Sequence, residues 1–541
     1  MSGSELELPL GKRTKWYRFW EMVPALISYG MLALMLVLSI FDPLLAAIYL
    51  LAMIIVLLIR AAGIAIASVG GRQMMVRASQ IDWPARLSDL ADVEAARARL
   101  GKPKVDDEYI HLHNLDAMSA SPDNYPEPKD ILQLVIVAAY NEPYGVIEPT
   151  IQSLVDCNYN HKQMIVVLAY EERGGRSIAN TARRLEREFA EQFRAFRVVE
   201  HPASLPDEVM GKGPNITYAA EKTVPWLHEQ GIDPRLVIVT TLDCDNKPDR
   251  SYFTSVAYEF IVHPNRRQTS FQPLSLYFGN IWDAPAPMRV IALGNTFWTI
   301  TSSVRPHMLR NFASHSQPLD ALIDMNFWSK RSIVEDGHQY WRSFFFFKGD
   351  YEVIPIYLPI YQDAVYVGSF KKSIVAQFKQ LRRWAYGASD VPYVAVRVFS
   401  PRREVALFGV LARFLRLVDS HISLATIAIL VTVGGWMPLI INYGAFRNIS
   451  AYNLPNMVSI IQTIAMVGIF ITIILSFKIL PPRPKHIKKR KYINMVAQWV
   501  LIPITSIFYS AFSSLNAQTH LLLGKYLDHF DVTEKSAAKH E

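Results

Sequence analysis

Cysteine is nearly absent from this chain of 541 residues, in which only Cys157 and Cys244 occur. Two cysteines cannot form the disulfide framework of a small secreted protein, and free thiols are typical of a cytosolic domain. No internal repeat and no low-complexity segment stands out, so a repeat architecture is not expected. The length exceeds what one ordinary core requires, and more than one domain is therefore predicted.

Charged side chains are missing from two long stretches near the N-terminus. Val23–Ile40 contains none over eighteen residues, and Leu44–Ile59 contains none before Arg60. A helix needs about 20 residues to cross a bilayer core. Both stretches reach that length with a few flanking residues, so a transmembrane hairpin is predicted over 23–69. A cleaved signal peptide is disfavoured because the stretch is too long and a second one follows at once.

Basic residues on both flanks of this hairpin set its expected orientation. Positive charge marks the cytoplasmic side of a span. Residues 1–22 are therefore predicted to be a cytosolic segment, and the chain from about residue 70 onward begins in the cytosol. The flanking basic residues are Lys12, Arg13, Lys15 and Arg18 before the hairpin, and Arg60, Arg72 and Arg77 after it.

The C-terminal third repeats the apolar pattern. Ser423–Ile441 and Met457–Phe477 are long enough to cross a bilayer, and Met495–Leu515 is a third candidate that a proline and several hydroxyl groups weaken. The basic loop Pro481–Tyr492 is expected on the cytoplasmic side. We therefore predict a C-terminal transmembrane region over 423–524.

Basic side chains also occur just before this region. Residues 401–422 keep Arg413 and Arg416 among apolar neighbours, which is typical of a helix that lies in the membrane interface. The net charge of +8, from 56 basic and 48 acidic residues, is thus mostly an effect of membrane topology. Nucleic-acid binding is not expected, because the charges flank apolar stretches.

Between the two apolar regions the chain alternates strand-like and helix-like stretches. A linker with helices is expected over 70–130, and the alternation then fills 131–400. This order predicts an α/β domain with a mainly parallel, Rossmann-like sheet that binds ligands at the carboxyl ends of its strands. The predicted strands are Ile131–Tyr140, Gln163–Tyr170, Phe196–His201 and Leu236–Leu242.

Polar residues follow these strands. Asp243 and Asp245 come after the fourth strand, and carboxylates so close repel each other unless a cation or donors lie between them. Lys212 and Asn215 begin a helix, whose N–H groups favour a phosphate. This combination indicates a divalent metal that bridges a diphosphate. Further candidates are Asn141 and Glu142 after the first strand, Glu171 and Glu172 after the second, Glu335 and Asp336 in VEDGHQYW, and Gln380, Arg383 and Trp384 in QFKQLRRWAYG.

Taken singly, each of these sequences has a simpler explanation. An Asp-x-Asp after a strand is more often a solvated loop or a helix cap, a Glu-Asp pair is usually on the surface, and Arg-Arg-Trp near a membrane is by default an interfacial anchor. Asp-x-Asp after an apolar strand also occurs in aspartyl-phosphate phosphatases, but these carry Thr or Val where this chain has Lys247. The order and spacing of all the pieces favour one functional site.

The motifs YNE, GKGPN, DCD, ED and QLRRW, in this order, resemble those of the membrane-embedded family 2 glycosyltransferases, the cellulose, chitin and hyaluronan synthases. The resemblance covers about 130–390 and the pattern of flanking apolar stretches. It implies a GT-A fold and a hexosyltransferase that uses a nucleotide-diphosphate sugar, with a UDP-sugar favoured, together with Mg²⁺ or Mn²⁺. The enzyme would be a multi-pass protein of the cytoplasmic (inner) membrane with its catalytic domain in the cytosol.

The resemblance also implies a role for each residue. Asp336 would be the general base, Asp245 would ligate the metal, and Asp243 would contact the nucleotide sugar. The family usually shows an Asp-Asp pair where this chain reads YEERGG, so Glu171 would take that place. The other implied substrate-binding residues are Asn141, Glu142 in the first nucleotide-contacting loop, Lys212 at the phosphates, Glu335, then Trp384 beneath the acceptor sugar, and finally Gln380 and Arg383, which would hold the diphosphate.

The tail 525–541 contains FDVTEK, in which Thr533 and Lys535 match the gating loop that closes over the nucleotide in cellulose synthases. A tail that reaches the site requires 493–524 to cross the membrane an even number of times or not at all. Two full crossings need about 40 residues, more than this segment has. We therefore expect a broken or re-entrant helical hairpin, bent near Pro503 or in the polar sequence SSLNAQTH. The alternative is a single crossing that leaves the tail outside the cytosol.

The expected function is that of a processive polysaccharide synthase that also translocates its product. One alternative is a single-transfer enzyme that acts on a lipid-linked acceptor. Another, of a different class, is a transporter or receptor whose middle domain is inactive. As an enzyme, the protein would have a nucleotide-sugar donor, a glycan or lipid-linked acceptor and membrane lipids as its partners.

Overall fold

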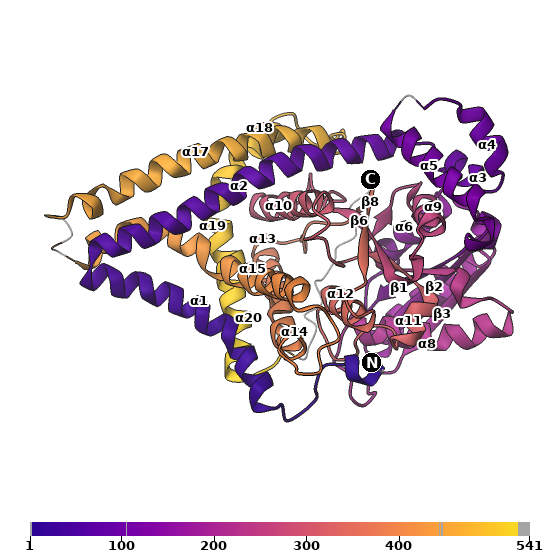
Figure 1. The fold of residues 1–541 in the computed structure, drawn as a ribbon, viewed down its shortest axis with the longest axis horizontal. Helices are drawn as coiled ribbons and strands as arrows, with labels where there is room; N and C mark the ends of the chain where they lie inside the picture. The colour runs from indigo at the N-terminus through magenta and orange to yellow at the C-terminus, as the bar shows by residue number, and fades with distance from the viewer. Residues whose placement is uncertain (1–2, 104, 443, 445–446, 528–541) are drawn as a thin grey trace.

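The computed structural model describes residues 3–103, 105–442, 444 and 447–527. Figure 1 shows a sheet with helices on both faces, and long helices that project from it to one side. The N-terminal region contains the helices α1 (Lys15–Phe41), α2 (Pro43–Gln80), α3 (Trp83–Asp89), α4 (Val93–Leu100) and α5 (Asp106–Ala120).

The middle of the chain forms the α/β domain. Its strands are β1 (Leu132–Ala139), β2 (Met164–Glu171), β3 (Ala195–His201), β4 (Val237–Asp243), β5 (Lys247–Pro248), β6 (Thr269–Leu276), β7 (His315–Pro318) and β8 (Glu352–Tyr361). Its helices are α6 (Tyr144–Val155), α7 (Gly175–Phe189), α8 (Lys212–Glu229), α9 (Tyr252–Val262), α10 (Ala286–Ser303), α11 (Leu319–Asp324), α12 (Glu335–Phe346), α13 (Phe370–Ala385) and α14 (Asp390–Val398).

Within the described residues the strands form one sheet in the order β3-β2-β1-β4-β7-β6-β8-β5. The first four are parallel, and Val135 of β1 lies between Val166 of β2 and Thr240 of β4. These are the four strands expected from the sequence, so the predicted α/β fold with a mainly parallel sheet is confirmed. The other half is mixed, because β7 pairs antiparallel with both β4 and β6 while β6 and β8 are parallel.

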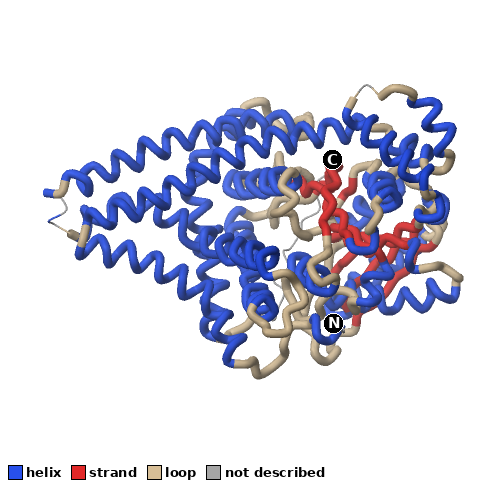
Figure 2. Tube along the Cα trace, in the orientation of Figure 1, coloured by secondary structure: helices blue, strands red, loops and turns tan. Residues whose placement is uncertain are grey.

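Helices cover both faces of the sheet (Figure 2). Alternate residues of β1 point to opposite faces, as the two-residue period of a strand requires. Val135 and Val137 pack on the face that α6, α7 and α9 cover, whereas Leu134 and Ile136 pack on the face that α8 and α12 cover. A strand buried on both faces needs an unbroken apolar sequence, which explains why these strands were recognisable.

The long helices α1, α2, α15 (Leu407–Val433) and α17 (Ile449–Ile479) lie side by side and extend away from the sheet (Figure 1). Apolar residues from α1, α2, α15 and α17, including Met35, Leu50, Leu430 and Leu454, form a core between them. In the described part of the chain, four helices are long and apolar enough to cross a membrane: Lys15–Phe41, Pro43–Gln80, Leu407–Ile441 and Lys491–Leu523. The fourth predicted span, 457–477, lies inside α17.

Two segment boundaries expected from the sequence fall inside continuous helices. The helix α2 extends past residue 69 to Gln80, and α15 passes through residue 422, where an interfacial helix was expected to end. A short helix, α16 (Met437–Ile441), follows α15. The side chains along such a helix change from apolar to polar while the helix itself continues. This is possible because the backbone hydrogen bonds of a helix do not depend on side-chain polarity.

The helical hairpin expected over 493–524 is wrong. The residues Lys491–Leu523 form one run of helix, made of α18 (Lys491–Ala497), α19 (Ile502–Thr505) and α20 (Phe512–Leu523) with tighter and wider turns between them. Its start packs against the α/β domain, where Tyr492 contacts Trp282 at 5.3 Å between ring centroids, and its end packs near Tyr386. Figure 1 shows α20 at an angle to α1 and close to the α/β domain, away from the far ends of the projecting helices. A bent helix therefore brings the chain back to the domain without a reversal.

Candidate active site

A cavity of about 600 Å³ lies at the carboxyl edge of β1, β2 and β4, where ligands bind in open α/β sheets. It continues from the starts of α8 and α12 to α10, α13, α15 and residues 509–513. The predicted residues that line it are Glu142, Glu171, Lys212, Asp243, Asp245, Glu335, Asp336, Gln380, Arg383 and Trp384. Asn141 is exposed next to this lining, and Thr533 and Lys535 lie outside the described residues.

Lys212, the first residue of α8, is surrounded by carboxylates. Its side chain is 8% exposed, and Nζ lies 2.9 Å from Asp243 Oδ1, 3.4 Å from Asp336 Oδ1 and 3.9 Å from Glu335 Oε1. Burial works to lower the pKa of Lys212, but the attraction of these three carboxylates outweighs it and raises the pKa overall. Lys212 therefore stays charged among three acidic groups.

Two of these carboxyl groups, Glu335 and Asp336, begin α12. Burial raises the pKa of Asp336 above the usual aspartate value, Lys212 opposes this shift, and Asp243 adds to it. Burial and the neighbouring Asp336 also raise the pKa of Glu335. A carboxylate with a raised pKa binds a proton more strongly, which suits a general base. The side chain of Asp336 is 22% exposed and lines the cavity.

The sequence GKGPN explains how α8 approaches so closely. A Cβ on Gly213 would lie 2.5 Å from the carbonyl oxygen of Ser329 and 3.1 Å from Cβ of Glu335, so only glycine fits between them. Asn215 is buried, and its Nδ2 donates to the carbonyls of Ala169, at 3.0 Å, and Ala139, at 3.3 Å. These carbonyls lie at the carboxyl ends of β2 and β1. Asn215 thus fixes the helix start to the strand ends.

The turn after β4 holds Asp245, whose side chain is buried and lines the cavity. With its amide nitrogen turned toward this carboxylate, the buried Asn246 donates to Asp245 Oδ1 at 3.1 Å and accepts from the backbone N–H of Asp243 at 3.2 Å. Thr150 of α6 donates to the carbonyl of Cys244 at 2.7 Å. Backbone and side-chain hydrogen bonds thus determine where both aspartates point.

Two glutamates complete the strand edge. Glu142 accepts from the backbone N–H of Tyr140 at 2.7 Å, and Glu171 accepts from Arg173 at 2.8 Å. Burial raises the pKa of Glu171, although Arg173 opposes the shift. Arg173 was not predicted as a site residue, and its guanidinium also lies 5.2 Å from the ring centre of Tyr140. The Arg that follows the two glutamates in YEERGG was a signal for this pair.

The opposite wall of the cavity comes from α13. Gln380, Arg383 and Trp384 are three and four residues apart and therefore share one face of the helix. The ring of Trp384 lies 6.2 Å from the ring of Tyr277, which follows β6 and was also missed. Burial, together with Asp243, Asp245 and Asp336, raises the pKa of Tyr277, so its hydroxyl keeps its proton. An aromatic pair thus faces the acidic cluster.

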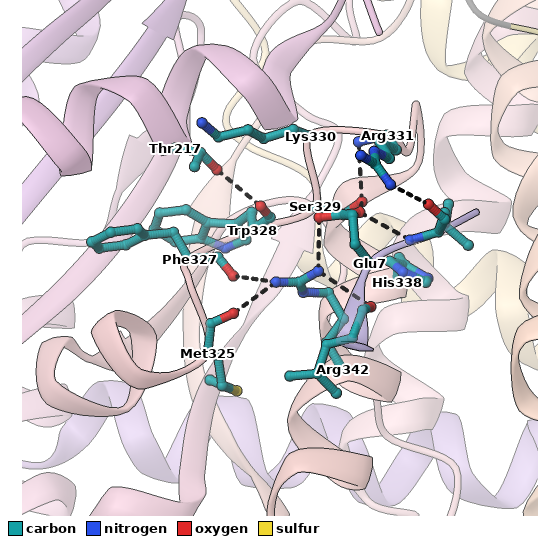
Figure 3. Close-up of polar contacts among 12 residues, drawn as sticks. Glu7, Thr217, Met325, Phe327, Trp328, Ser329, Lys330, Arg331, His338 and Arg342 are labelled. Carbon is teal, nitrogen blue, oxygen red and sulfur yellow. Dashed lines mark hydrogen bonds and ion pairs between the residues drawn. The ribbon is translucent and has the colours of Figure 1, made fainter. Parts of the chain in front are cut away.

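The N-terminal residue Glu7 contacts the loop that precedes α12 and lies beside Ser329 in Figure 3. Arg342 of α12 is fully buried and donates to the carbonyls of Met325, at 2.8 Å, and Phe327, at 3.2 Å. The same guanidinium donates to Glu7 Oε2 at 3.1 Å, and Glu7 also contacts the Ser329 hydroxyl. Arg331 donates to the carbonyl of Leu8 at 3.0 Å (Figure 3).

Residues 5–8 therefore join the α/β domain although α1 and α2 separate them from it in sequence. Leu6 is buried in the core beneath α12 and its carbonyl accepts from Tyr393. The loop has a positive φ of +56° at Phe327, which is unusual for an aromatic residue. Arg342 donates a hydrogen bond to the carbonyl of Phe327 and so stabilises this backbone conformation. No sequence pattern indicated this contact, because a pair more than 300 residues apart has no local signal.

No family model matches the chain, and no curated protein matches its sequence. Similar solved structures include the mannosyltransferase PcManGT from Pyrobaculum calidifontis in complex with GDP-Man and Mn²⁺, with a TM-score of 0.38, 11% identity, and coverage of 81% of this chain and 98% of that chain. They also include residues 1–349 of S. aureus TarS in complex with UDP-GlcNAc, with a TM-score of 0.33, 9% identity, and coverage of 73% and 93%. These are glycosyltransferases, but they are not members of the cellulose, chitin or hyaluronan synthases that the motifs resemble.

Proposed function

We propose that this chain is a membrane-integrated inverting glycosyltransferase that transfers a hexose from a nucleotide-diphosphate sugar, with a UDP-sugar favoured, to a glycan or lipid-linked acceptor. The observation that carries the proposal is the acidic cluster around Lys212 at the sheet edge. It places a cation, a candidate base and a candidate metal ligand in one cavity that continues toward the apolar helices. The inactive-scaffold alternative does not explain why these charged groups are buried together.

In the proposed reaction, Asp336 accepts the proton of an acceptor hydroxyl while its oxygen attacks the anomeric carbon of the donor. The bond between that carbon and the diphosphate oxygen breaks, and the nucleoside diphosphate leaves with the electron pair. Attack from the side opposite the leaving group inverts the anomeric configuration. Lys212 and Arg383 are placed to meet the charge that develops on the diphosphate.

The residues at the end of β4 fit a divalent metal. Among the described residues, no group of three or more His, Cys, Asp or Glu could hold one, so the protein would supply Asp245 and, at most, Asp243. Mg²⁺ is commonly bound by one or two carboxylates plus substrate phosphates, and Mn²⁺ accepts the same oxygen ligands. Bound there, the metal would neutralise charge on the diphosphate. Because Asp243 contacts Lys212, Asp245 is the main candidate ligand.

The experiment that tests this proposal is a measurement of nucleotide release. The full-length protein, purified in detergent, is mixed with a panel of radiolabelled nucleotide sugars. Release of nucleoside diphosphate and of labelled product from at least one donor is expected. No release from any donor would favour the transporter or receptor alternative.

Two forms of the reaction have separate support. A processive synthase is supported by QLRRW and by a cavity that continues from Trp384 to α15. A single transfer to a lipid-linked acceptor is supported by the apolar core that fills the space between α1, α2, α15 and α17, with Leu50 and Leu430 buried at its centre. Product length separates the two forms, because a synthase makes a ladder of chains and a single-transfer enzyme adds one sugar.

Trp384→Ala is expected to reduce transfer to the acceptor about tenfold, and hydrolysis of the donor less. An indole offers a flat apolar face to a sugar ring, and a loss of about 1.4 kcal/mol corresponds to that factor. Both rates are measured on the same membrane preparation. Trp436→Ala, an exposed tryptophan in the helical region, is the control for membrane anchoring. Equal loss of both reactions together with poor insertion would show that Trp384 serves as an anchor instead.

The tail remains a proposed gating loop. Leu527, the last described residue, donates its backbone N–H to the Tyr386 hydroxyl at 3.3 Å, so the tail starts beside the end of α13. A cysteine placed at Ser536 is expected to react with a membrane-impermeant thiol reagent only from the side of the catalytic domain, and bound nucleotide is expected to protect it. Labelling from the opposite side of sealed vesicles would end the gating proposal.

A further inference from the structure

Arg310 lines the same cavity as the acidic cluster around Lys212. Its guanidinium lies 4.7 Å from the ring centre of Trp341 and 5.6 Å from that of Tyr340, both on α12. These two residues follow Asp336 by four and five positions, which is a rise of about 6 to 8 Å along a helix. In the part of the chain that the structure describes, the guanidinium has ring contacts but no hydrogen bond or ion pair.

The surroundings of Arg310 carry an excess of positive charge. Burial lowers the pKa of Arg310, Tyr340 and Asp390 oppose the shift, and Arg413 and Arg416 add to it. Asp390 already accepts a hydrogen bond from His338 at 2.6 Å. Two further guanidinium groups and one carboxylate thus act on the charge of Arg310. An anion at this position would relieve their repulsion and use the unpaired donors of Arg310.

The helix α15, which contributes to the cavity lining, is joined to α2 where the apolar stretch of α2 ends. Arg60, the first charged residue after that stretch, pairs with Asp419 of α15 at 2.8 Å. Leu424, one turn further along α15, and Trp298 of α10 both line the cavity, and they are 42% and 53% exposed. Arg416 donates to the carbonyl of His307, which joins α15 to the loop that carries Arg310. The exposed apolar mouth therefore lies beside the basic residues.

We propose that Arg310 binds the phosphate of a lipid-linked acceptor whose hydrocarbon chain leaves the cavity between Trp298 and Leu424. This inference rests on the proposed glycosyl transfer and specifies its acceptor class. The attached sugar, whose hydroxyl is to react, would then lie in the cavity that Arg310 and Asp336 both line. The hydrocarbon chain passes an apolar mouth at the edge of the candidate spans, where a lipid enters without crossing a polar surface.

The test measures binding, so it does not depend on catalysis. The full chain in phosphatidylcholine nanodiscs is titrated with a polyisoprenyl monophosphate, with the corresponding polyisoprenol and with phosphatidylglycerol, and adducts are followed by native mass spectrometry. We expect the polyisoprenyl phosphate to bind at least about tenfold more tightly than either of the others, since a charge-assisted hydrogen bond is worth about that factor. Equal binding of the alcohol, or of phosphatidylglycerol, would overturn the proposal.

Substitutions then locate the site. R310Q is expected to abolish the preference for the phosphate, R310K is expected to keep part of it because it retains the charge without the planar fork, and R402Q is the matched control on an exposed arginine. Thermal unfolding without lipid shows whether R310Q is folded. If R310Q is unfolded, the proposal is decided by lipid binding to the unmodified chain and to R310K. A phosphate preference unchanged in R310K and R310Q would place the phosphate elsewhere and overturn the assignment. Nucleotide release without a phosphate preference would reject this inference and leave the glycosyltransferase proposal standing.

Discussion

Replacing Asp336 by asparagine is expected to lower the turnover number about 100-fold or more, with little change in the affinity for the nucleotide sugar. Asparagine has nearly the same size and can still accept a hydrogen bond from Lys212, but it cannot take up the proton of the acceptor hydroxyl. Lys212 keeps its contact of 2.9 Å with Asp243, so the donor-binding cation stays in place. Initial rates with a labelled donor and donor affinity by titration calorimetry are the two measurements.

A matched control uses the same chemical change at an exposed position. Asp156→Asn at the end of α6 alters a surface carboxylate and should leave both quantities unchanged. If Asp336→Asn instead weakened nucleotide binding and spared turnover, Asp336 would be a donor-binding residue and the base would have to be another group.

The raised pKa of Asp336 predicts a pH dependence. The base must be ionised, so kcat/KM is expected to fall as the pH falls through this pKa, at a pH above the usual aspartate value of about 3.9. Lys212 lowers the pKa of Asp336. Lys212→Gln removes that charge and should therefore raise the pKa of Asp336. The fall of kcat/KM on the acidic side of the pH profile should then occur at higher pH, and donor binding should also weaken. If the fall of kcat/KM occurred at the same pH in Lys212→Gln, a group other than Asp336 would control it.

The four parallel strands were predictable because burial on both faces demands unbroken runs of apolar residues. The carboxyl ends of these strands then placed Asp243, Asp245, Glu142 and Glu171 at one edge, as the α/β rule requires. The strands β6 and β8 were not predicted. They contain Pro273, Pro355 and Pro359, and proline lowers the expectation of a strand because it donates no ladder hydrogen bond.

Other features depend on contacts that a linear pattern does not encode. The hairpin over 493–524 was expected because the tail had to return to the cytosol with too few residues for two crossings, whereas Lys491–Leu523 is one run of helix whose end packs near Tyr386. The burial of Arg342 against Glu7 and the approach of Tyr277 to Trp384 arise from tertiary packing. Sequence motifs therefore predicted most charged residues of the candidate site and Trp384, but not Arg173, Tyr277 or the N-terminal residues that contact the loop before α12.

Replacing Asp245 by alanine is expected to reduce transfer about 1000-fold, to a level close to abolition, while the protein stays folded and inserted. The reason is that a metal at the diphosphate supplies several kcal/mol of stabilisation to the leaving group, and Asp245 is its main candidate ligand. The substitution removes little apolar packing, because the carboxylate lies at a turn where the Asn246 amide is its neighbour. The unfolding temperature and the membrane fraction should therefore match those of the unmodified chain.

Chelation gives the same prediction without a mutation. Excess chelator should suppress transfer by the unmodified protein, and Mg²⁺ or Mn²⁺ should restore it, whereas neither treatment should alter the residual rate of Asp245→Ala. Asp283→Ala, on an exposed loop that packs beside the C-terminal helices, controls for the loss of a carboxylate and should respond to chelator like the unmodified chain. Full activity in excess chelator would mean that Lys212 and Arg383 alone meet the charge of the leaving diphosphate, and Asp245 would then be a structural residue of the turn after β4.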